Sequence, residues 1–354
     1  MSTITTLVKQ AIADKITPGA AAAIIPLNGA KVPKTYFEGH HTHEQNAKAV
    51  DRKAIFDLAS LTKIMCTGVL MAQAISDDRI RLNDEPFPKW PGVQVRHLLL
   101  HNSGLPAWKP FYQEILPQET GLPSGKTELI KQVLKTQLEA PVGETTVYSD
   151  LGFIALGHLL EQTYGQTLDV IYNQWLLQNI PECQLSFVSI METGFHPTLN
   201  QVLPTAKCVW RGRRIHGQVH DDNAFCMGGV AGHAGLFGRL KDTILFGQWL
   251  HQTLQTTTPL GQTLKAMIQK QDHRAFAFDI PTEGGSTAET LSNKAIGHLG
   301  FTGTSFWLDP GDDTHLAALY VLLTNRVYFE DSLAGIKKLR RHFHQKATTQ
   351  LTQF

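Results

Sequence analysis

The stretch FDLASLTKIM (residues 56–65) is the most informative part of this 354-residue chain. It places Ser60 and Lys63 three residues apart in a largely apolar segment. Residues at this spacing share one face of a helix, so the hydroxyl and the amine would lie side by side. Loss of hydration disfavours a charged amine, and we therefore expect a lowered pKa for Lys63. A neutral amine could take the proton of Ser60, which predicts a serine nucleophile.

Length and composition fit a folded enzyme. A chain of 354 residues suggests two domains or one bilobed unit. Hydrophobic residues make up 42% and charged residues 18% of the sequence, unlike a disordered chain. The net charge of +1 favours neither nucleic acid nor an acidic membrane. The four cysteines form no Cys-x-x-Cys pair, so we expect free thiols rather than a disulfide framework or a zinc site.

The N-terminal residues lack the basic and apolar regions of a secretory signal, and no apolar run is long enough to span a bilayer. We therefore expect a cytoplasmic protein with no membrane and no nucleic-acid partner. Its expected partner is a small-molecule or short-peptide substrate. A monomer and a small homo-oligomer both remain open.

Predicted strands lie at both ends of the chain, and most predicted helices lie in the middle. The strand-like runs are 20–25, 301–308 and 316–324. Helical patterns cover 3–14, 60–76, 93–101, 126–139, 150–164, 241–270 and 331–345. Since two flanks can form one sheet around an insertion, we predict a discontinuous sheet domain from 1–60 and 225–354 and a mostly helical domain from 61–224. The active site would lie in the cleft between them.

Tyr148-Ser149-Asp150 stands just before the helix predicted over 150–164. On the simpler interpretation, Ser149 or Asp150 caps that helix. On the functional interpretation, Tyr148 carries protons, because a neighbouring lysine stabilises the phenolate.

His298-Leu299-Gly300 precedes the strand predicted over 301–308. A single histidine is more often structural than functional, but this one is followed by a glycine that would let a substrate backbone approach closely. Backbone N–H groups of an edge strand can also bind an extended ligand or an oxyanion.

In their order and separation, these three motifs resemble those of serine hydrolases related to class C β-lactamases and penicillin-binding proteins. That family includes D-alanyl-D-alanine carboxypeptidases, D-aminopeptidases and esterases. The segments VRHLLLHNSGLP (residues 95–106) and GGVAGHAGLF (residues 228–237) are similar to further segments of the family. The resemblance implies an α/β fold of the α+β sandwich type, with an antiparallel sheet flanked by helices and an inserted all-helical domain.

The resemblance also implies roles for individual residues. Ser60 would be the nucleophile, Lys63 its activating amine, and Tyr148 the group that passes protons to the leaving group. The backbone N–H groups of Ser60 and Phe301 would form the oxyanion hole. His298 would orient Tyr148 or meet the polar end of the substrate. The expected substrate-binding residues are Asp150, Gly300, Thr302, His220, Asp221 and Arg213.

The last three of these residues belong to the polar segment WRGRRIHGQVHDDN (residues 210–223). It is either a solvated basic loop or a wall of the cleft, where Arg213, His220 and Asp221 could bind an anionic or sugar-bearing substrate. The His-Asp pair raises the question of a metal, but no third ligand stands at a suitable spacing, so we expect neither metal nor cofactor. A similar Val-His-Asp stretch occurs in family members that act on muramyl-peptide fragments of the cell wall.

Two departures from the family bear on the substrate. Asp150 stands where many relatives have asparagine, and an ionised carboxylate cannot donate a hydrogen bond to a substrate carbonyl. It would instead pair with Lys63 or bind a substrate amine. His298 stands where most β-lactamases of this type have lysine, which favours a peptidase, amidase or esterase. We expect an acyl-enzyme hydrolase of esters, amides or peptides; the alternatives are a carboxylesterase, a weak β-lactamase and a non-catalytic ligand-binding or scaffold relative.

Overall fold

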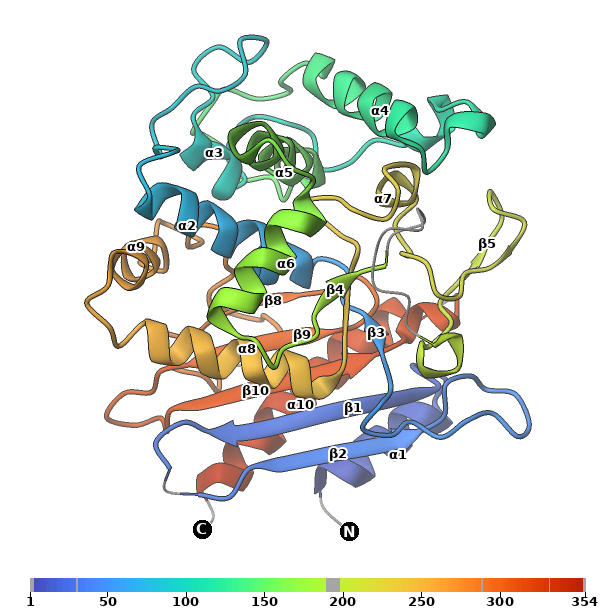
Figure 1. Cartoon of the computed structure of the whole chain (residues 1–354). Coiled ribbons are helices and arrows are strands. Elements are labelled where there is room, and N and C mark those ends of the chain that lie inside the picture. The colour runs from blue at the N-terminus through green and yellow to red at the C-terminus, as the bar shows by residue number, and fades with distance from the viewer. Residues whose placement is uncertain (1–2, 30, 189–197, 288, 331, 353–354) are drawn as a thin grey trace.

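The computed structural model describes residues 3–29, 31–188, 198–287, 289–330 and 332–352. Its main feature is a five-stranded antiparallel sheet built from both ends of the chain, in the order β2-β1-β10-β9-β8 (Figure 1). The strands are β1 (Gly19–Pro26), β2 (Lys34–Gly39), β8 (Ile296–Leu299), β9 (Ser305–Asp309) and β10 (Ala318–Thr324). The predicted sheet is therefore confirmed, and β8, which carries His298, is an edge strand.

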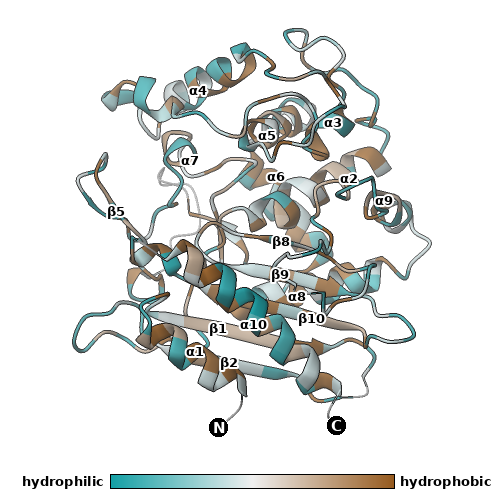
Figure 2. Cartoon of the chain, turned by 180° about the vertical axis from the view of Figure 1, so that it is seen from behind, coloured by the Kyte–Doolittle hydropathy of each residue, from teal (hydrophilic) through white to brown (hydrophobic). Residues whose placement is uncertain are grey.

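Helices cover both faces of this sheet. Strand β1 is buried at all eight positions, because alternate side chains enter two different apolar clusters. Ala20 and Ala22 pack with the helices α1 (Thr3–Ala13) and α10 (Leu333–Thr352), which Figure 2 shows in front of the sheet. Ala21 and Ala23 belong to the other cluster, together with residues of α8 (Leu240–Thr253).

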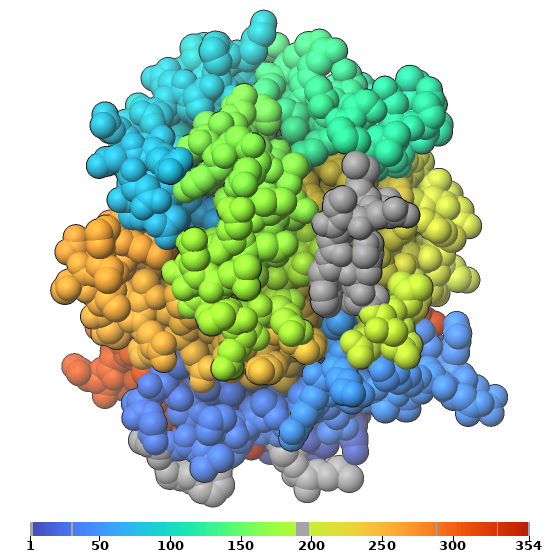
Figure 3. All heavy atoms as spheres, viewed as in Figure 1, coloured from blue at the N-terminus to red at the C-terminus, as the bar shows by residue number. Residues whose placement is uncertain are grey.

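The remaining helices form a separate layer above the sheet in the view of Figure 1. They are α2 (Val69–Ser76), α3 (Val95–Leu99), α4 (Pro123–Lys135), α5 (Asp150–Tyr164), α6 (Leu168–Asn179), α7 (Asp222–Cys226) and α9 (Pro259–Met267). Figure 3 shows that the middle of the chain, coloured cyan to green, forms the upper part of this face, and that the blue N-terminal part lies along its base. The domain boundaries at residues 60 and 225 stay a prediction.

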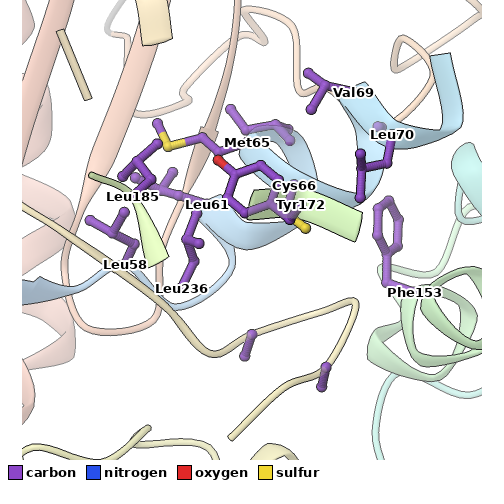
Figure 4. Close-up of a cluster of buried hydrophobic side chains, with 14 of the residues drawn as sticks. Leu58, Leu61, Met65, Cys66, Val69, Leu70, Phe153, Tyr172, Leu185 and Leu236 are labelled. Atoms are coloured by element: carbon purple, nitrogen blue, oxygen red, sulfur yellow. The ribbon is translucent and has the colours of Figure 1, made fainter. Parts of the chain in front are cut away.

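The segment after Ser60 is anchored in the largest apolar cluster. Figure 4 shows Leu61, Met65 and Cys66 from this segment among buried side chains that include Phe153 of α5 and Tyr172 of α6. Just before Ser60, β3 (Phe56–Asp57) pairs with β7 (Leu236–Gly238) in a small sheet whose third strand is β4 (Ser186–Phe187). The position of Ser60 is thus set by packing on both sides of it in the sequence.

Two sequence-based assignments near the site were wrong in detail. The stretch 60–76 is not one α-helix: Ser60 lies in a turn, and a π-helical segment η1 (Lys63–Gly68) precedes α2. Such π-helical turns are frequent at functional sites. Phe301 does not lie in a strand, because the N–H of Gly303 bonds the carbonyl of Gly300 and closes a turn between β8 and β9.

Several other predictions can be compared directly. The helices expected over 3–14 and 150–164 are confirmed. The prolines and glycines between residues 181 and 222 predict irregular structure there, and residues 189–197 of this stretch lie outside the described part of the chain. All four cysteines are free thiols. Within the described ranges, no helix has both the length and the apolar character that a membrane span requires.

Candidate active site

A strained turn presents Ser60. Ala59 has φ = +49°, a left-handed conformation that is uncommon for a residue with a Cβ and often marks a functional site. The buried carboxylate of Asp57 holds this turn by accepting the N–H of Ala59 at 2.8 Å. Its second oxygen accepts the N–H of His220 at 2.7 Å, and its backbone carbonyl accepts the hydroxyl of Thr302. Asp57 therefore joins three segments of the site; burial raises its pKa to about 6.

The Lys63 amine lies directly beside the proposed nucleophile. Its Nζ donates to Ser60 Oγ at 3.1 Å, to Asp150 Oδ1 at 2.7 Å and to the carbonyl of His233 at 3.2 Å. These three acceptors use all the donors of an ammonium group. The Lys63 side chain is fully buried, so its position is fixed by these contacts and by packing.

The expected lowering of the Lys63 pKa is wrong. Burial acts in that direction, but Asp150 and Tyr148 raise the pKa by more, so it lies above its ordinary value. The expectation of a stabilised Tyr148 phenolate is also wrong: burial and Asp150 raise the pKa of Tyr148 by more than Lys63 lowers it. The resting site at neutral pH thus contains an ammonium group and a neutral phenol.

Tyr148 is held over the amine by residues from another segment. Lys63 Nζ lies 4.8 Å from the centroid of its ring, and Lys63 and Ser60 both act to lower the pKa of the Tyr148 hydroxyl. The His101 ring lies 4.6 Å from the Tyr148 ring, and His101 Nδ1 accepts the N–H of Ser149 at 2.9 Å. Burial holds the pKa of His101 well below its usual range, so a neutral ring is available as acceptor.

Sequence reasoning missed His101 as a site residue. The signal that could have found it is its place in the segment 95–106, which resembles a family segment. Ser149 caps α5 by accepting the N–H of Gly152, and this leaves the Asp150 carboxylate free to pair with Lys63. The sequence left two candidates for the N-cap of α5, Ser149 and Asp150, and in the structure the cap is Ser149.

His298 lies beside the Tyr148 ring, with 5.7 Å between ring centroids. Its Nδ1 lies 2.7 Å from the carbonyl of Leu299, so Nδ1 carries a proton and Nε2 is the acceptor. Burial lowers the pKa of His298 to about 4, so the imidazole is neutral at pH 7. Nε2 is buried and has no hydrogen-bond partner among the described residues.

Ser60, Tyr148, Asp150 and Phe301 line one pocket of about 380 Å³. Within the described ranges, the backbone N–H groups of Ser60 and Phe301 have no hydrogen-bond acceptor, so both are available to an oxyanion. The rest of the lining is Asp57, Ala59, Trp108, Val219, His220, Asp221, Asp222, His233 and Ala234.

The segment 210–223 contributes to this pocket, though not through all the expected residues. The His220 ring stacks on Phe301 at 5.5 Å, and Asp221 caps α7 and pairs with His233 at 3.0 Å. Arg213 is exposed on a short hairpin, where it bonds Gln218, and it is not part of the pocket lining. The buried arginine next to the pocket is Arg211, which pairs with Asp222 at 2.7 Å.

Two further expectations from the third motif need correction. Thr302 is buried, donates its hydroxyl to the carbonyl of Asp57, and is not among the residues that line the pocket. Gly300 does not make room for a substrate: a Cβ there would meet Thr304 and would lie 2.7 Å from the carbonyl of Leu58. The glycine is required because the β8–β9 turn packs closely against the segment that leads to Ser60.

Gly300→Ala is therefore expected to lower the free energy of unfolding by about 2–3 kcal/mol, since the added methyl group would meet both the buried side chain of Thr304 and the backbone carbonyl of Leu58. Urea unfolding measures this change. Gly152→Ala is the matched control: its Cβ would make an ordinary contact at 3.6 Å, and alanine suits the helix, so its stability should equal or exceed that of the native chain. Equal stability of the Gly300 and Gly152 variants would contradict this account.

The described residues include no group of three or more His, Cys, Asp or Glu side chains arranged to hold a metal ion.

A serine bonded to a buried lysine, with a tyrosine beside both and two free backbone N–H groups, defines the site of a serine hydrolase. Comparison with known proteins gives the family. The Beta-lactamase family model matches residues 4–344, and the chain belongs to that family of serine hydrolases.

Curated relatives carry names of cell-wall enzymes. The chain is 28% identical over 327 residues to an N-acetylmuramyl-L-alanine amidase of Bacillus subtilis (strain 168), covering 82% of this chain and 72% of that protein. It is 26% identical over 313 residues to a protein of Escherichia coli (strain K12) named "Putative D-alanyl-D-alanine carboxypeptidase", covering 77% and 70%.

Solved structures share the fold. EstCE1, described as a hydrolase with promiscuous acyltransferase activity, has a TM-score of 0.71 at 19% identity and covers 98% of this chain and 97% of its own. A simvastatin synthase mutant from Aspergillus terreus has a TM-score of 0.69 at 17% identity, with 99% of both chains covered. A β-lactamase from Mycobacterium bovis has a TM-score of 0.60 at 18% identity, with 96% and 99% covered.

Proposed function

We propose that this hydrolase cleaves an amide bond in muramyl-peptide fragments of the bacterial cell wall through an acyl-enzyme on Ser60. The observation that carries the chemistry is the 3.1 Å contact between Ser60 and a buried lysine at the wall of a pocket. The cell-wall substrate is supported by the similarity to the Bacillus subtilis amidase over 82% of the chain.

The proposed reaction uses each group for one task. The substrate carbonyl enters beside Ser60, and the N–H groups of Ser60 and Phe301 stabilise the developing oxyanion, with about 3 kcal/mol for each donor. The proton of Ser60 passes to the Tyr148–Lys63 pair after that pair has lost a proton to solvent, and the pair then protonates the leaving amine. Water then attacks the acyl-enzyme with the proton transfers reversed: the Tyr148–Lys63 pair takes a proton from the water and returns one to Ser60. The acid is released and the serine hydroxyl is restored.

Charge in the pocket favours an acyl group without a carboxylate. Lys63 is paired with Asp150, and Arg211 is paired with Asp222. Burial lowers the pKa of His220 to about 4, so its ring adds no positive charge at pH 7. A penicillin carboxylate would therefore find no unpaired cation among the lining residues of the described chain, whereas a neutral sugar ether or amide avoids that requirement.

Polar and aromatic groups at the pocket wall suit a sugar-bearing substrate. Asp221 and Asp222 provide carboxylate oxygens that can accept hydrogen bonds from hydroxyl or amide groups. Trp108 is 46% exposed and lines the pocket, so its ring face is available to the apolar side of a sugar. We assign substrate contact to these residues and to His220, and no role to Arg213.

A substrate panel tests the proposal. The purified chain is expected to release the peptide from N-acetylmuramyl-L-alanyl peptides with kcat/KM at least about tenfold above that for D-alanyl-D-alanine peptides or penicillins, a difference of about 1.4 kcal/mol. Mass spectrometry of the products identifies the cleaved bond, and Ser60→Ala protein is the control for each substrate. Cleavage confined to D-alanyl-D-alanine peptides would contradict the assigned substrate.

A carboxylesterase is the second candidate. Trp108 and Phe301 present large exposed rings at the pocket, and such surfaces can pack against an acyl chain. Ser60-dependent hydrolysis of short-chain p-nitrophenyl esters without any cleavage of muramyl-peptides would favour it. The cytoplasmic location and the monomeric or small oligomeric state stay predictions from the sequence.

A further inference from the structure

A buried arginine from the last helix holds the turn that contains Phe301. Arg340 of α10 is 7% exposed, and its Nη2 donates to the carbonyl of Gly300 at 2.6 Å and to that of Thr304 at 2.7 Å. Its Nε donates to the carbonyl of Gly303 at 3.3 Å. One side chain therefore makes three hydrogen bonds to the five-residue connection between β8 and β9.

The positively charged guanidinium of Arg340 faces carbonyl groups of this turn. Within the described residues it forms no ion pair with a carboxylate, and the three carbonyls are its acceptors. Burial lowers its pKa to about 9, so the guanidinium stays charged at pH 7. A buried cation without a counter-ion carries a desolvation cost, which its hydrogen bonds to the three carbonyls offset in part.

The acceptor at 2.6 Å belongs to the peptide unit that matters most for the reaction. The carbonyl of Gly300 and the N–H of Phe301 are the two ends of one planar trans peptide, and they point in opposite directions. A donor fixed on the oxygen therefore fixes the direction of the N–H. Phe301 lines the pocket that contains Ser60, and its N–H has no acceptor within the described chain.

The positive charge of Arg340 also strengthens its hydrogen bond to the carbonyl of Gly300. A hydrogen bond from an ionised donor is stronger than a neutral one, and hydrogen bonds in a chain polarise one another. A guanidinium on the carbonyl of Gly300 thus makes the Phe301 N–H a better donor. Arg326 acts on the next peptide: its Nε donates to the carbonyl of Phe301 at 2.7 Å.

We propose that Arg340 is a positioning residue for the oxyanion hole, and that its guanidinium orients and polarises the Gly300–Phe301 peptide so that the Phe301 N–H faces the carbonyl attacked by Ser60. The inference rests on the proposed acyl-enzyme function. Because the oxyanion charge appears only in the transition state, Arg340 should act on kcat and on the binding of transition-state analogues, with little effect on KM.

The test compares full-length Arg340→Met, Arg340→Lys and Arg341→Met proteins on a substrate that the native enzyme hydrolyses and Ser60→Ala does not. Arg340→Met is expected to lower kcat by about 10- to 100-fold with KM changed less than about threefold, and to weaken a boronic-acid transition-state analogue in parallel. Arg340→Lys should recover part of kcat, since an ammonium can still reach a carbonyl but lacks the planar fork. Arg341→Met, at the exposed neighbouring position of α10, should match the native enzyme.

Thermal unfolding and the fraction of active sites labelled by a phosphonate separate this effect from loss of folded protein. If Arg340→Met does not fold, Arg340→Lys carries the comparison. A folded variant with native kcat, or one whose loss of analogue affinity is no larger than its change in KM, would overturn the assignment of Arg340 and leave the proposed function intact. Equal rates for native and Ser60→Ala protein on every substrate would overturn the proposed function itself, and this inference with it.

Discussion

Ser60→Ala is expected to lower kcat/KM by at least about 10⁴-fold while the protein stays folded, because removal of a catalytic nucleophile leaves only binding and oxyanion stabilisation. The lost Oγ accepts one hydrogen bond, from Lys63, and that amine keeps Asp150 and the carbonyl of His233 as partners. Steady-state kinetics measure the loss, and circular dichroism with thermal unfolding shows whether the fold is retained. Ser76→Ala, at the C-terminal end of α2, is the matched control and should keep native activity.

Covalent labelling provides an independent check on the same residue. A serine-reactive phosphonate should add to Ser60 alone, and digestion followed by mass spectrometry locates the adduct. The chain offers competing hydroxyls close by, including the buried Ser149 in the second motif and Thr62 in the first. An adduct on either of these, or retained turnover in Ser60→Ala, would contradict the assignment of the nucleophile.

Asp150→Asn is expected to move the alkaline rise of activity to lower pH by at least about one pH unit, because an opposite charge at this range raises the pKa of an ammonium by about 1 to 3 units. The direction of the pH shift follows from the effect of Asp150 on the pKa values of both Lys63 and Tyr148. Asp150 raises the pKa of Lys63 and also that of Tyr148, and the reaction needs this pair to lose a proton. Without the carboxylate, burial of Lys63 lowers its pKa, so a larger fraction of the amine is neutral at pH 7.

The measurement is kcat/KM against pH from 6 to 10 for native and variant enzymes on one Ser60-dependent substrate. In the native enzyme, kcat/KM should rise with pH through the neutral range, since the base form of the pair grows about tenfold per pH unit below its pKa. Asp169→Asn, in the first turn of α6, is the control and should leave the profile unchanged. Coincident profiles for the native and Asp150→Asn enzymes would show that Asp150 does not set the charge of the Lys63–Tyr148 pair.

Much of the fold follows from local sequence patterns. The apolar run 20–25 predicts a short buried strand, and β1 is buried at all its positions. The spacing over 3–14 and 150–164 predicts α1 and α5. The residue types in three motifs also indicate a serine, a lysine and a tyrosine in one hydrolase site. These features depend on near neighbours in the chain or on the chemistry of single side chains, and both can be read without coordinates.

Only the tertiary structure decided the charge state of the site and the contacts that hold its residues in place. The pKa of Lys63 is raised because Asp150, 87 residues away in sequence, lies 2.7 Å from its amine, whereas burial alone would have lowered it. Arg340 reaches the carbonyl of Gly300 across 40 residues of sequence, and Arg213 faces solvent although it belongs to a segment that lines the pocket. Electrostatic and hydrogen-bonding energies depend on distances through space, and folding brings those partners together.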